Sequence, residues 1–193
     1  SGPSHAEEVA QEKLTYLTVG TKNSKLGKYI SDLLITKYII STVSNDMIGI
    51  EYSSSLKNIY SIMVGIAHGL GYGDNFLSVL ISHSSKEMSD FIKAIHKTNR
   101  KINHSAYLGD LLVTTYSSFS RNRTFGNMIG KGYSSNSAKA EMKMIVEGYY
   151  ATKNAFILSK KLSTKFLIID ICHKILFENK SAEGNDNSVK KAS

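Results

Sequence analysis

The sequence predicts a mostly α-helical protein that begins with a short α/β segment. Three observations indicate this fold class. Proline, which breaks helix interiors, occurs once in 193 residues, at Pro3. Runs rich in β-branched and aromatic residues lie within the first 45 residues. From about Ser53 onward, apolar residues recur with the 3.6-residue period of a helix.

The first 45 residues predict a strand–helix–strand unit. Residues 6–13 predict a short helix with acidic residues near its start. Residues 14–19 and 38–43 predict two strands, and Asn23 or Ser24 would cap the helix between them. The apolar positions of that helix follow the helical period: Leu26, Tyr29, Ile30, Leu33 and Leu34. Because two strands cannot close a sheet, we expect this unit to be the end of a larger α/β domain.

Helices are predicted for most of the remaining chain. One contains Leu56–Leu70 and ends at a glycine-rich break, and the next is expected to be capped by Asp74 or Asn75. Two more are predicted at residues 138–159 and 168–176. The domain boundaries are therefore placed at 1–45, 46–180 and 181–193, the last being a polar segment expected to form a disordered tail.

Composition excludes several classes of protein. The net charge is +8, but the lysines are scattered rather than clustered, which favours a basic surface that attracts anionic metabolites over a nucleic-acid-binding stripe. A single cysteine, Cys172, forbids an internal disulfide and fits a reducing cytosol. The histidines show no i, i+4 pair and no Cys/His cluster, so no metal site is predicted. No apolar run reaches the ~20 residues of a membrane span, and no signal peptide is predicted.

The stretch from Leu108 to Gly126 carries the strongest chemical signal. It combines the Asp110 carboxylate, several hydroxyls and the triplet Arg121-Asn122-Arg123 in what we interpret as a loop-and-turn region. Guanidinium groups donate in pairs to phosphate oxygens, and a helix beginning after Ser120 would point free N–H groups at the same anion. A phosphate-ester site and a solvated basic turn both fit this stretch when it is taken alone.

Three further positions carry candidate chemistry. Lys57 lies in a largely apolar helix with Ser54 and Ser61 on its face, which suits a proton-transferring lysine in a cleft or, alternatively, a lysine that extends to solvent at a helix end. Glu147 lies next to a glycine in an apolar helix and is either a partnered buried carboxylate or a surface glutamate. His68 is on the Lys57 helix, four residues after Val64, and is expected at the same cleft.

In combination, these segments resemble the NAD(P)-dependent glycerol-3-phosphate dehydrogenases of the bacterial soluble type. The resemblance rests on five motifs that occur in the order and at the spacing of that family, and it covers nearly everything from Ser1 to about Lys180. The motifs are Gly2-Pro3-Ser4 with Ala6 and Glu8, Ser55-Leu56-Lys57-Asn58, the run Gly65 to Asn75, Leu108-Gly109-Asp110-Leu111, and Ser120-Arg121-Asn122-Arg123 with Val146-Glu147-Gly148.

The resemblance implies roles for individual residues. Lys57 is similar to the catalytic proton donor and acceptor at the substrate C2 oxygen. Asp110 is similar to the residue that contacts substrate hydroxyls beside that lysine. Further substrate-binding positions are Gly2, Ser4, Ser120, Arg121 and Asn122. The cofactor-contacting positions are Ala6, Arg121, Ile145 and Glu147. No metal is implied.

The resemblance also implies a reaction and an architecture. The expected reaction interconverts dihydroxyacetone phosphate and sn-glycerol 3-phosphate with NAD or NADP in the cytoplasm, supplying a glycerophospholipid precursor. The expected fold is an all-helical substrate domain of the 6-phosphogluconate-dehydrogenase-like type, preceded by a remnant of a Rossmann domain. The family's Gly-x-Gly-x-x-Gly motif is absent, so we expect the chain to lack most of the nicotinamide site and to have little turnover alone. A homodimer is compatible with this interpretation.

Two other readings stay open at this point. One is a different β-hydroxyacid-type dehydrogenase that acts on a phosphorylated substrate. The other is a non-catalytic helical module for anion binding or dimerisation.

Overall fold

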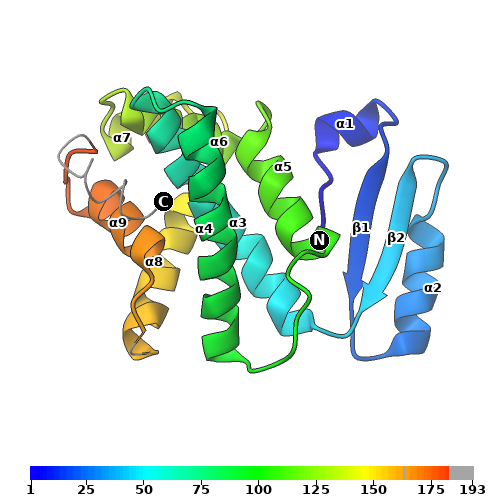
Figure 1. The fold of residues 1–193 in the computed structure, drawn as a ribbon. Helices are drawn as coiled ribbons and strands as arrows, with labels where there is room; N and C mark the ends of the chain where they lie inside the picture. The colour runs from blue at the N-terminus through cyan, green and yellow to red at the C-terminus, as the bar shows by residue number, and fades with distance from the viewer. Residues whose placement is uncertain (163, 183–193) are drawn as a thin grey trace.

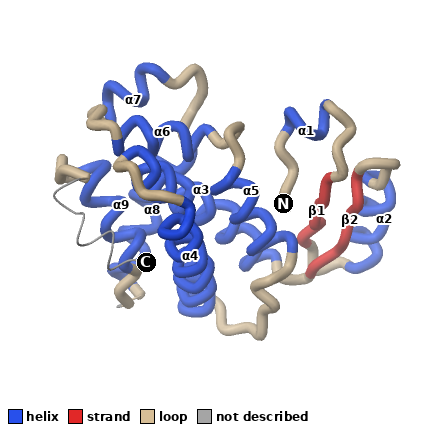
Figure 2. Tube along the Cα trace, turned by 45° about the horizontal axis from the view of Figure 1, so that its top comes forward, coloured by secondary structure: helices blue, strands red, loops and turns tan. Residues whose placement is uncertain are grey.

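The computed structural model describes residues 1–162 and 164–182 and consists of a helical bundle beside a small α/β unit (Figure 1). The α/β unit contains α1 (Ala6–Ala10), β1 (Thr15–Gly20), α2 (Ser24–Leu34) and β2 (Ile39–Ser44). The bundle contains α3 (Met47–Gly69), α4 (Asp74–Ile95), the π-helix η1 (Ser105–Gly109), α5 (Asp110–Tyr116), α6 (Arg121–Gly130), α7 (Ser135–Glu141), α8 (Glu147–Lys161) and α9 (Leu167–Phe177). Figure 2 shows that the strands lie at one end of the molecule. The predicted mostly helical fold is confirmed.

The two strands are parallel neighbours. They pair in register from Thr15 opposite Ile39 to Gly20 opposite Ser44. The other edge of β1 is covered by the start of the chain, where Ser1 and Thr18 exchange backbone hydrogen bonds of 2.7 and 3.2 Å. The N-terminal residues are therefore held against the sheet beside the bundle.

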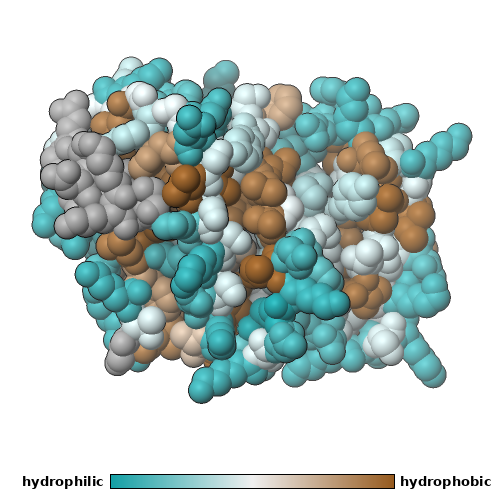
Figure 3. All heavy atoms as spheres, in the orientation of Figure 1, coloured by the Kyte–Doolittle hydropathy of each residue, from teal (hydrophilic) through white to brown (hydrophobic). Residues whose placement is uncertain are grey.

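Helix α2 forms where the sequence predicts it, but its apolar face is exposed to solvent. The Asn23 side chain caps it by accepting a hydrogen bond from the Leu26 N–H at 3.0 Å. Its buried positions are the small residues Gly27 and Ser31, whereas the apolar stripe points outward, with Tyr29 64% and Leu33 67% exposed. Figure 3 shows apolar side chains on the surface at this end of the molecule. The period of the sequence identifies the apolar face of α2 but does not say what covers it.

Several predicted elements differ from the structure, beginning with α1, which ends at Ala10 rather than at residue 13. Helix α3 begins at Met47, about six residues earlier than the change near Ser53, because Asp46 caps it by accepting from the Gly49 N–H at 3.1 Å. The N-cap of α4 is Gly73, without a side-chain cap. The stretch from Leu108 to Gly126 is helical except around residues 117–120, and the helix predicted at 138–159 is broken at 142–146. Of the predicted tail, residues 183–193 lie outside the described residues, and Ala182 is buried.

Helix α3 is the centre of the bundle and contacts α4, α5, α6, α8 and α9. Ile59, Tyr60, Ile62 and Met63 have no solvent exposure, so this helix is buried on all sides over these turns. Its approach to α6 is unusually close, because an added Cβ at Gly126 would overlap the Ile62 carbonyl. This contact brings the start of α6 next to the middle of α3.

Helix α9 is capped by a side chain from another helix. The Glu87 carboxylate of α4 accepts hydrogen bonds from the N–H groups of Ile168 at 2.8 Å and Ile169 at 3.1 Å. Burial raises the pKa of Glu87 to about 7, although these N–H groups act in the opposite direction. Burial therefore disfavours the ionised form of the Glu87 carboxylate that caps α9.

This cap predicts a pH dependence of stability. Because the pKa of Glu87 is higher in the folded state than its ordinary 4.5, its contribution is fully present below pH ~4.5 and is lost as pH rises through about 7. We expect the free energy of unfolding to fall by roughly 2–3 kcal/mol more between pH 4.5 and 8 than it does in Glu87→Gln. Urea unfolding of both proteins at several pH values measures this difference, and other titrating groups cancel in the comparison. Parallel pH profiles would contradict it.

Two expected absences concern only the described residues. Among them, no helix combines the length and hydropathy needed to cross a membrane. Within the same ranges, no group of His, Cys, Asp and Glu side chains is arranged to hold a metal ion. Cys172 is buried, and burial raises the pKa of its thiol to about 12, so the thiol stays protonated.

Candidate functional site

Lys57 and Asp110 form a close ion pair between two neighbouring helices. Lys57 lies in the middle of α3, and Asp110 is the first residue of α5. The Lys57 Nζ atom is 2.6 Å from Oδ1 of Asp110, and the side chains are 21% and 3% exposed, respectively. Because an ammonium has three donors, Lys57 keeps N–H groups for another acceptor on its open side.

The segment before α1 reaches the same pair. The Ser1 hydroxyl donates to Oδ2 of Asp110 at 3.1 Å. Gly2 is buried with φ +134°, and a side chain there would overlap the Tyr16 carbonyl, so glycine allows the segment to pass close to β1. Ser4 donates to the Gly2 carbonyl at 3.0 Å. Gly2 therefore shapes this segment.

Helix α6 begins directly after Ser120, and the Ser120 side chain caps it. Its hydroxyl accepts a hydrogen bond from the Arg123 N–H at 3.3 Å and lies 2.9 Å from the Ser61 hydroxyl. The Ser120 side chain is thus committed within the fold. Residues two positions apart on a helix point about 200° apart, which explains why Arg121 lines the cavity described below and Arg123 does not.

An amide network joins the three helices that carry the candidate residues. The Asn122 amide donates to Oδ1 of Asn58 at 3.0 Å and accepts from the Gly148 N–H at 2.9 Å. Asn58 in turn donates to Oε2 of Glu147 at 3.3 Å. A side chain at Gly148 would overlap this junction, because its Cβ would lie 2.6 Å from the Asn58 backbone carbonyl and 2.8 Å from Oδ1 of Asn122. The network fixes α3, α6 and α8 relative to one another.

Sequence reasoning missed Asn58 and Ser1 as parts of this site. Asn58 belongs to the motif Ser55-Leu56-Lys57-Asn58, but nothing in the sequence places its amide against α6 and α8. The signal that could have found it is its position next to Lys57, because neighbours of a candidate residue at a buried helix junction need polar partners.

These elements enclose one cavity of about 440 Å³. Predicted residues that line it are Ser4, Ala6, Lys57, Ser120, Arg121, Asn122 and Glu147. Gly2 and Asp110 are not among the lining residues, and Asp110 contacts the cavity through Lys57. His5 and Phe119 also line the cavity, with ring centroids 6.2 Å apart.

Arg121 lies where the cavity meets the loop 142–146. Its Nη2 atom is 3.6 Å from Oε1 of Glu147, and its Nη1 donates to the sulfur of Met144 at 3.2 Å. Glu147 is a largely exposed carboxylate with an arginine partner, so neither sequence alternative for it holds in full. Ile145 is 71% exposed and lines an adjoining pocket of about 370 Å³ that shares Met144 with the cavity. Ile145 is thus next to the cavity rather than in it.

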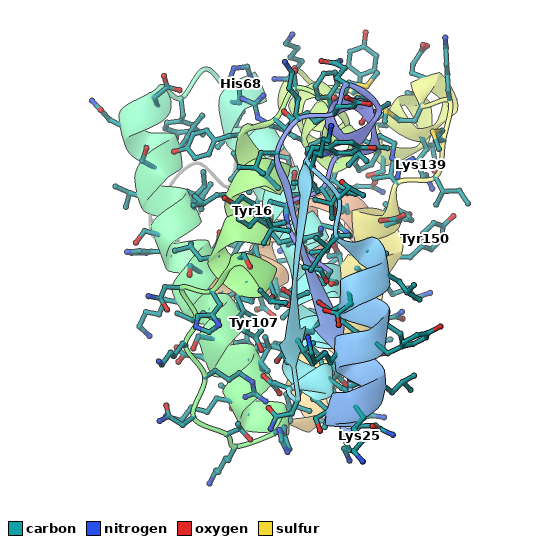
Figure 4. The ribbon with its side chains drawn as sticks, turned by 90° about the vertical axis from the view of Figure 1, so that its right-hand side faces the viewer. Tyr16, Lys25, His68, Tyr107, Lys139 and Tyr150 are labelled. Atoms are coloured by element: carbon teal, nitrogen blue, oxygen red, sulfur yellow. The ribbon has the colours of Figure 1, made fainter. Side chains whose placement is uncertain are left out.

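His68 does not reach the cavity. It is exposed near the end of α3, where its ring nitrogen lies 2.5 Å from the Asn127 amide (Figure 4). The glycine-rich run that follows it is the end of α3, as predicted, with Gly71 at φ +92°. The expected placement of His68 at the cleft is therefore wrong.

Comparisons with known proteins identify the family. A family profile for the NAD-dependent glycerol-3-phosphate dehydrogenase C-terminus matches residues 46–184. Curated relatives named glycerol-3-phosphate dehydrogenase [NAD(P)+] from Agathobacter rectalis and Fusobacterium nucleatum are 37% and 39% identical over 182 residues. In each case this covers 94% of the chain and 54% of the relative, so the chain spans about half the length of the curated relatives it matches.

A solved structure gives the same result. The crystal structure of glycerol-3-phosphate dehydrogenase from Coxiella burnetii aligns with a TM-score of 0.93 at 31% identity, over 99% of this chain and 58% of that one. The fold also matches the Plasmodium falciparum glycerol-3-phosphate dehydrogenase structure, with a TM-score of 0.88 at 22% identity and coverage of 100% and 55%. Since the family profile covers most of its length, the chain belongs to the NAD-dependent glycerol-3-phosphate dehydrogenase C-terminal family.

Proposed function

We propose that this chain is the substrate-binding and catalytic part of a glycerol-3-phosphate dehydrogenase that interconverts dihydroxyacetone phosphate and sn-glycerol 3-phosphate. The observation that carries the proposal is the Lys57–Asp110 pair, which presents an ammonium to a cavity that Arg121 also lines. An ammonium for a ketone oxygen and a guanidinium for a phosphate are the two groups that this substrate requires. The names of the relatives support the same reaction.

Lys57 is the proposed proton donor. When the ketone is reduced, its C2 oxygen gains negative charge as hydride arrives at C2, and the oxygen must take a proton. Lys57 gives that proton from Nζ and takes it back in the reverse direction. Asp110 keeps the ammonium oriented through the 2.6 Å contact and leaves its other N–H groups for the substrate.

Arg121 is the proposed phosphate ligand. It is the first residue of α6 and lines the cavity, and both a guanidinium and a helix start favour an anion. The Asn122 amide is already used twice within the fold, which leaves one N–H for substrate. Ser120 and Gly2 act by shaping the site, and Ser4 contributes a hydroxyl at its wall.

The cofactor, NAD or NADP, would supply the hydride. Ala6, Arg121 and Glu147 line the cavity, and Ile145 lies in the adjoining pocket, which shares Met144 with it. These residues would hold part of the dinucleotide. Ala6 has no side chain beyond Cβ and leaves room there.

Residues 1–45 are proposed to be the last part of the dinucleotide-binding domain, with residues 46–180 forming the substrate domain. The exposed apolar stripe of α2 and the short two-stranded sheet support this division, because both are surfaces that a larger α/β domain would cover. The proposed compartment is the cytoplasm.

The test is oxidation of NADH or NADPH on addition of dihydroxyacetone phosphate to the full-length protein, meaning the longest natural chain that contains this sequence. We expect substrate-dependent oxidation, and we expect Arg121→Ala to raise the KM for dihydroxyacetone phosphate by about 100-fold, the worth of two charge-assisted hydrogen bonds. Unphosphorylated dihydroxyacetone is the control substrate, for which Arg121→Ala should change kcat/KM little. No oxidation with either cofactor by the folded protein would refute the proposed function.

A further inference from the structure

Polar contacts join α3 to the segment η1–α5 at regular intervals. The Ser53 hydroxyl donates to the Ala106 carbonyl at 3.3 Å, and the Ser61 hydroxyl donates to the Thr114 carbonyl at 2.8 Å. The Lys57–Asp110 contact lies between these two. All three contacts join residues that are 53 positions apart, so the two helical segments run parallel and are matched turn by turn.

The pairing of Lys57 with Asp110 depends on the π-helix that precedes α5. A π-helical turn holds one residue more than an α-helical turn, and η1 leads into α5 without a break at Asp110. Changing the register by one residue would rotate every following residue by about 100° around the helix axis. The Asp110 carboxylate would then no longer face Lys57. Something must therefore hold η1 in this form.

Asp46, Arg100 and Tyr107, which we call the brace, hold η1 against the start of α3. The Tyr107 hydroxyl, in the middle of η1, donates to Oδ2 of Asp46 at 2.6 Å. Arg100 donates to the same carboxylate through Nε and, at 3.0 Å, through Nη2. Asp46 is also the N-cap of α3, the helix that carries Lys57. Figure 4, which views the molecule from the side of the sheet, labels Tyr107.

The brace is largely buried, and its two charged residues, Arg100 and Asp46, form an ion pair. The side chains of Arg100 and Asp46 are 6% and 11% exposed. Burial alone would raise the pKa of Asp46, but the hydrogen bonds from Arg100 and Tyr107 lower it overall. Burial and the bond to Asp46 raise the pKa of Tyr107, so its hydroxyl remains a donor. These bonds keep the same donors and acceptors across the working pH range.

We propose that Asp46, Arg100 and Tyr107 are positioning residues, which hold the π-helix in register and so set the Lys57–Asp110 contact. The inference rests on the proposed function for its kinetic consequence, but its structural part stands apart from that function. The brace lies at the junction of the α/β unit and the bundle, since Asp46 lies two residues after the end of β2 and directly before α3. It links that junction to the pair in the cavity.

The kinetic test is Tyr107→Phe in the full-length protein, which removes one hydroxyl and keeps the ring. We expect kcat to fall by roughly 10- to 100-fold, because a small misplacement of a reacting group has effects of this size. The KM for dihydroxyacetone phosphate should stay within about twofold, because Arg121 and Asn122 lie on α6, away from the brace. The matched control is Tyr116→Phe, whose hydroxyl contacts Ser78 at 3.2 Å outside the brace, and which should change neither value.

A second measurement does not depend on turnover. An amine-reactive reagent, followed by peptide mass spectrometry, reports how fast Lys57 is modified in the folded protein. We expect several-fold faster modification of Lys57 in Tyr107→Phe than in the wild type or Tyr116→Phe, because the ammonium is released from Asp110. A protein without turnover that shows this increase would refute the proposed function and support the brace. Unchanged labelling of Lys57, or a kcat loss that only follows the folded fraction, would overturn the inference.

Discussion

Replacing Lys57 with alanine in the full-length protein is expected to lower kcat on the order of 10³-fold, because the developing alkoxide at C2 then has no proton donor. Lys57→Arg should fail as well, since a guanidinium stays protonated and does not fit the 2.6 Å contact with Asp110. The measurement is steady-state reduction of dihydroxyacetone phosphate at saturating cofactor. The KM for the phosphorylated substrate should change far less than kcat, because Arg121 is untouched.

The control for Lys57 must separate chemistry from folding. Lys57→Ala leaves the buried Asp110 carboxylate without its cation, and loss of one partner of a buried pair costs about 3–5 kcal/mol. The double variant Lys57→Ala with Asp110→Asn removes that unpaired charge and should regain stability while remaining inactive. Lys86→Ala, which breaks an exposed ion pair with Asp90, is the matched lysine control. Activity regained together with stability would show that Lys57 acts through the fold alone.

Much of the fold could be predicted because the signals are local. The helical period gives α3, α4 and α9, and the predicted cap at Asn23 acts on an N–H group three residues away. The apolar stripe on α2 is equally visible in the sequence, but the sequence of this helix does not say which element, if any, packs on the stripe. A periodic pattern describes a surface and not its neighbour.

The stretch around Asp110 was predicted as a loop because it is rich in hydroxyl residues, but it is helical in the structure. Thr114 and Thr115 suggest a turn, but in α5 their hydroxyls donate to the carbonyls of Asp110 and Leu111, four residues earlier, which satisfies them within a helix. The π-helix has no sequence signature, since it is maintained by the distant Asp46 and Arg100. The break at 142–146 contains neither glycine nor proline.

The candidate site was predictable only as a set of separate residues. The order of motifs assigns Lys57, Asp110 and Arg121, and in the structure Lys57 and Arg121 line one cavity while Asp110 pairs with Lys57. The amide network of Asn58, Asn122 and Gly148 was not predictable, because it depends on three helices that meet at angles no spacing encodes.

Gly126→Ala is expected to lower the free energy of unfolding by about 3 kcal/mol or more. Helix propensity alone predicts the opposite, a gain of about 1 kcal/mol for alanine over glycine inside a helix. The added Cβ would overlap the Ile62 carbonyl, and Gly130, one turn later, faces the Ile66 carbonyl in the same way. Helices α3 and α6 would have to separate over their whole contact, and overpacking against backbone has few side-chain rotamers with which to relax.

The sign of the Gly126→Ala effect distinguishes the two mechanisms in a single urea titration. Gly73→Ala is the control, because Gly73 has φ −82° and open space around it, so this change should lower the free energy of unfolding by less than about 1 kcal/mol.

The close contact between α3 and α6 also has a kinetic consequence, since Ile62 lies one turn from Asn58, and Gly126 one turn from Asn122. Separation of the helices would stretch the 3.0 Å hydrogen bond between the Asn122 and Asn58 amides and raise the KM of the variant for dihydroxyacetone phosphate. If Gly126→Ala instead stabilised the protein, the two helices could move apart at little cost, and the amide network rather than the glycine contact would hold α6 in place.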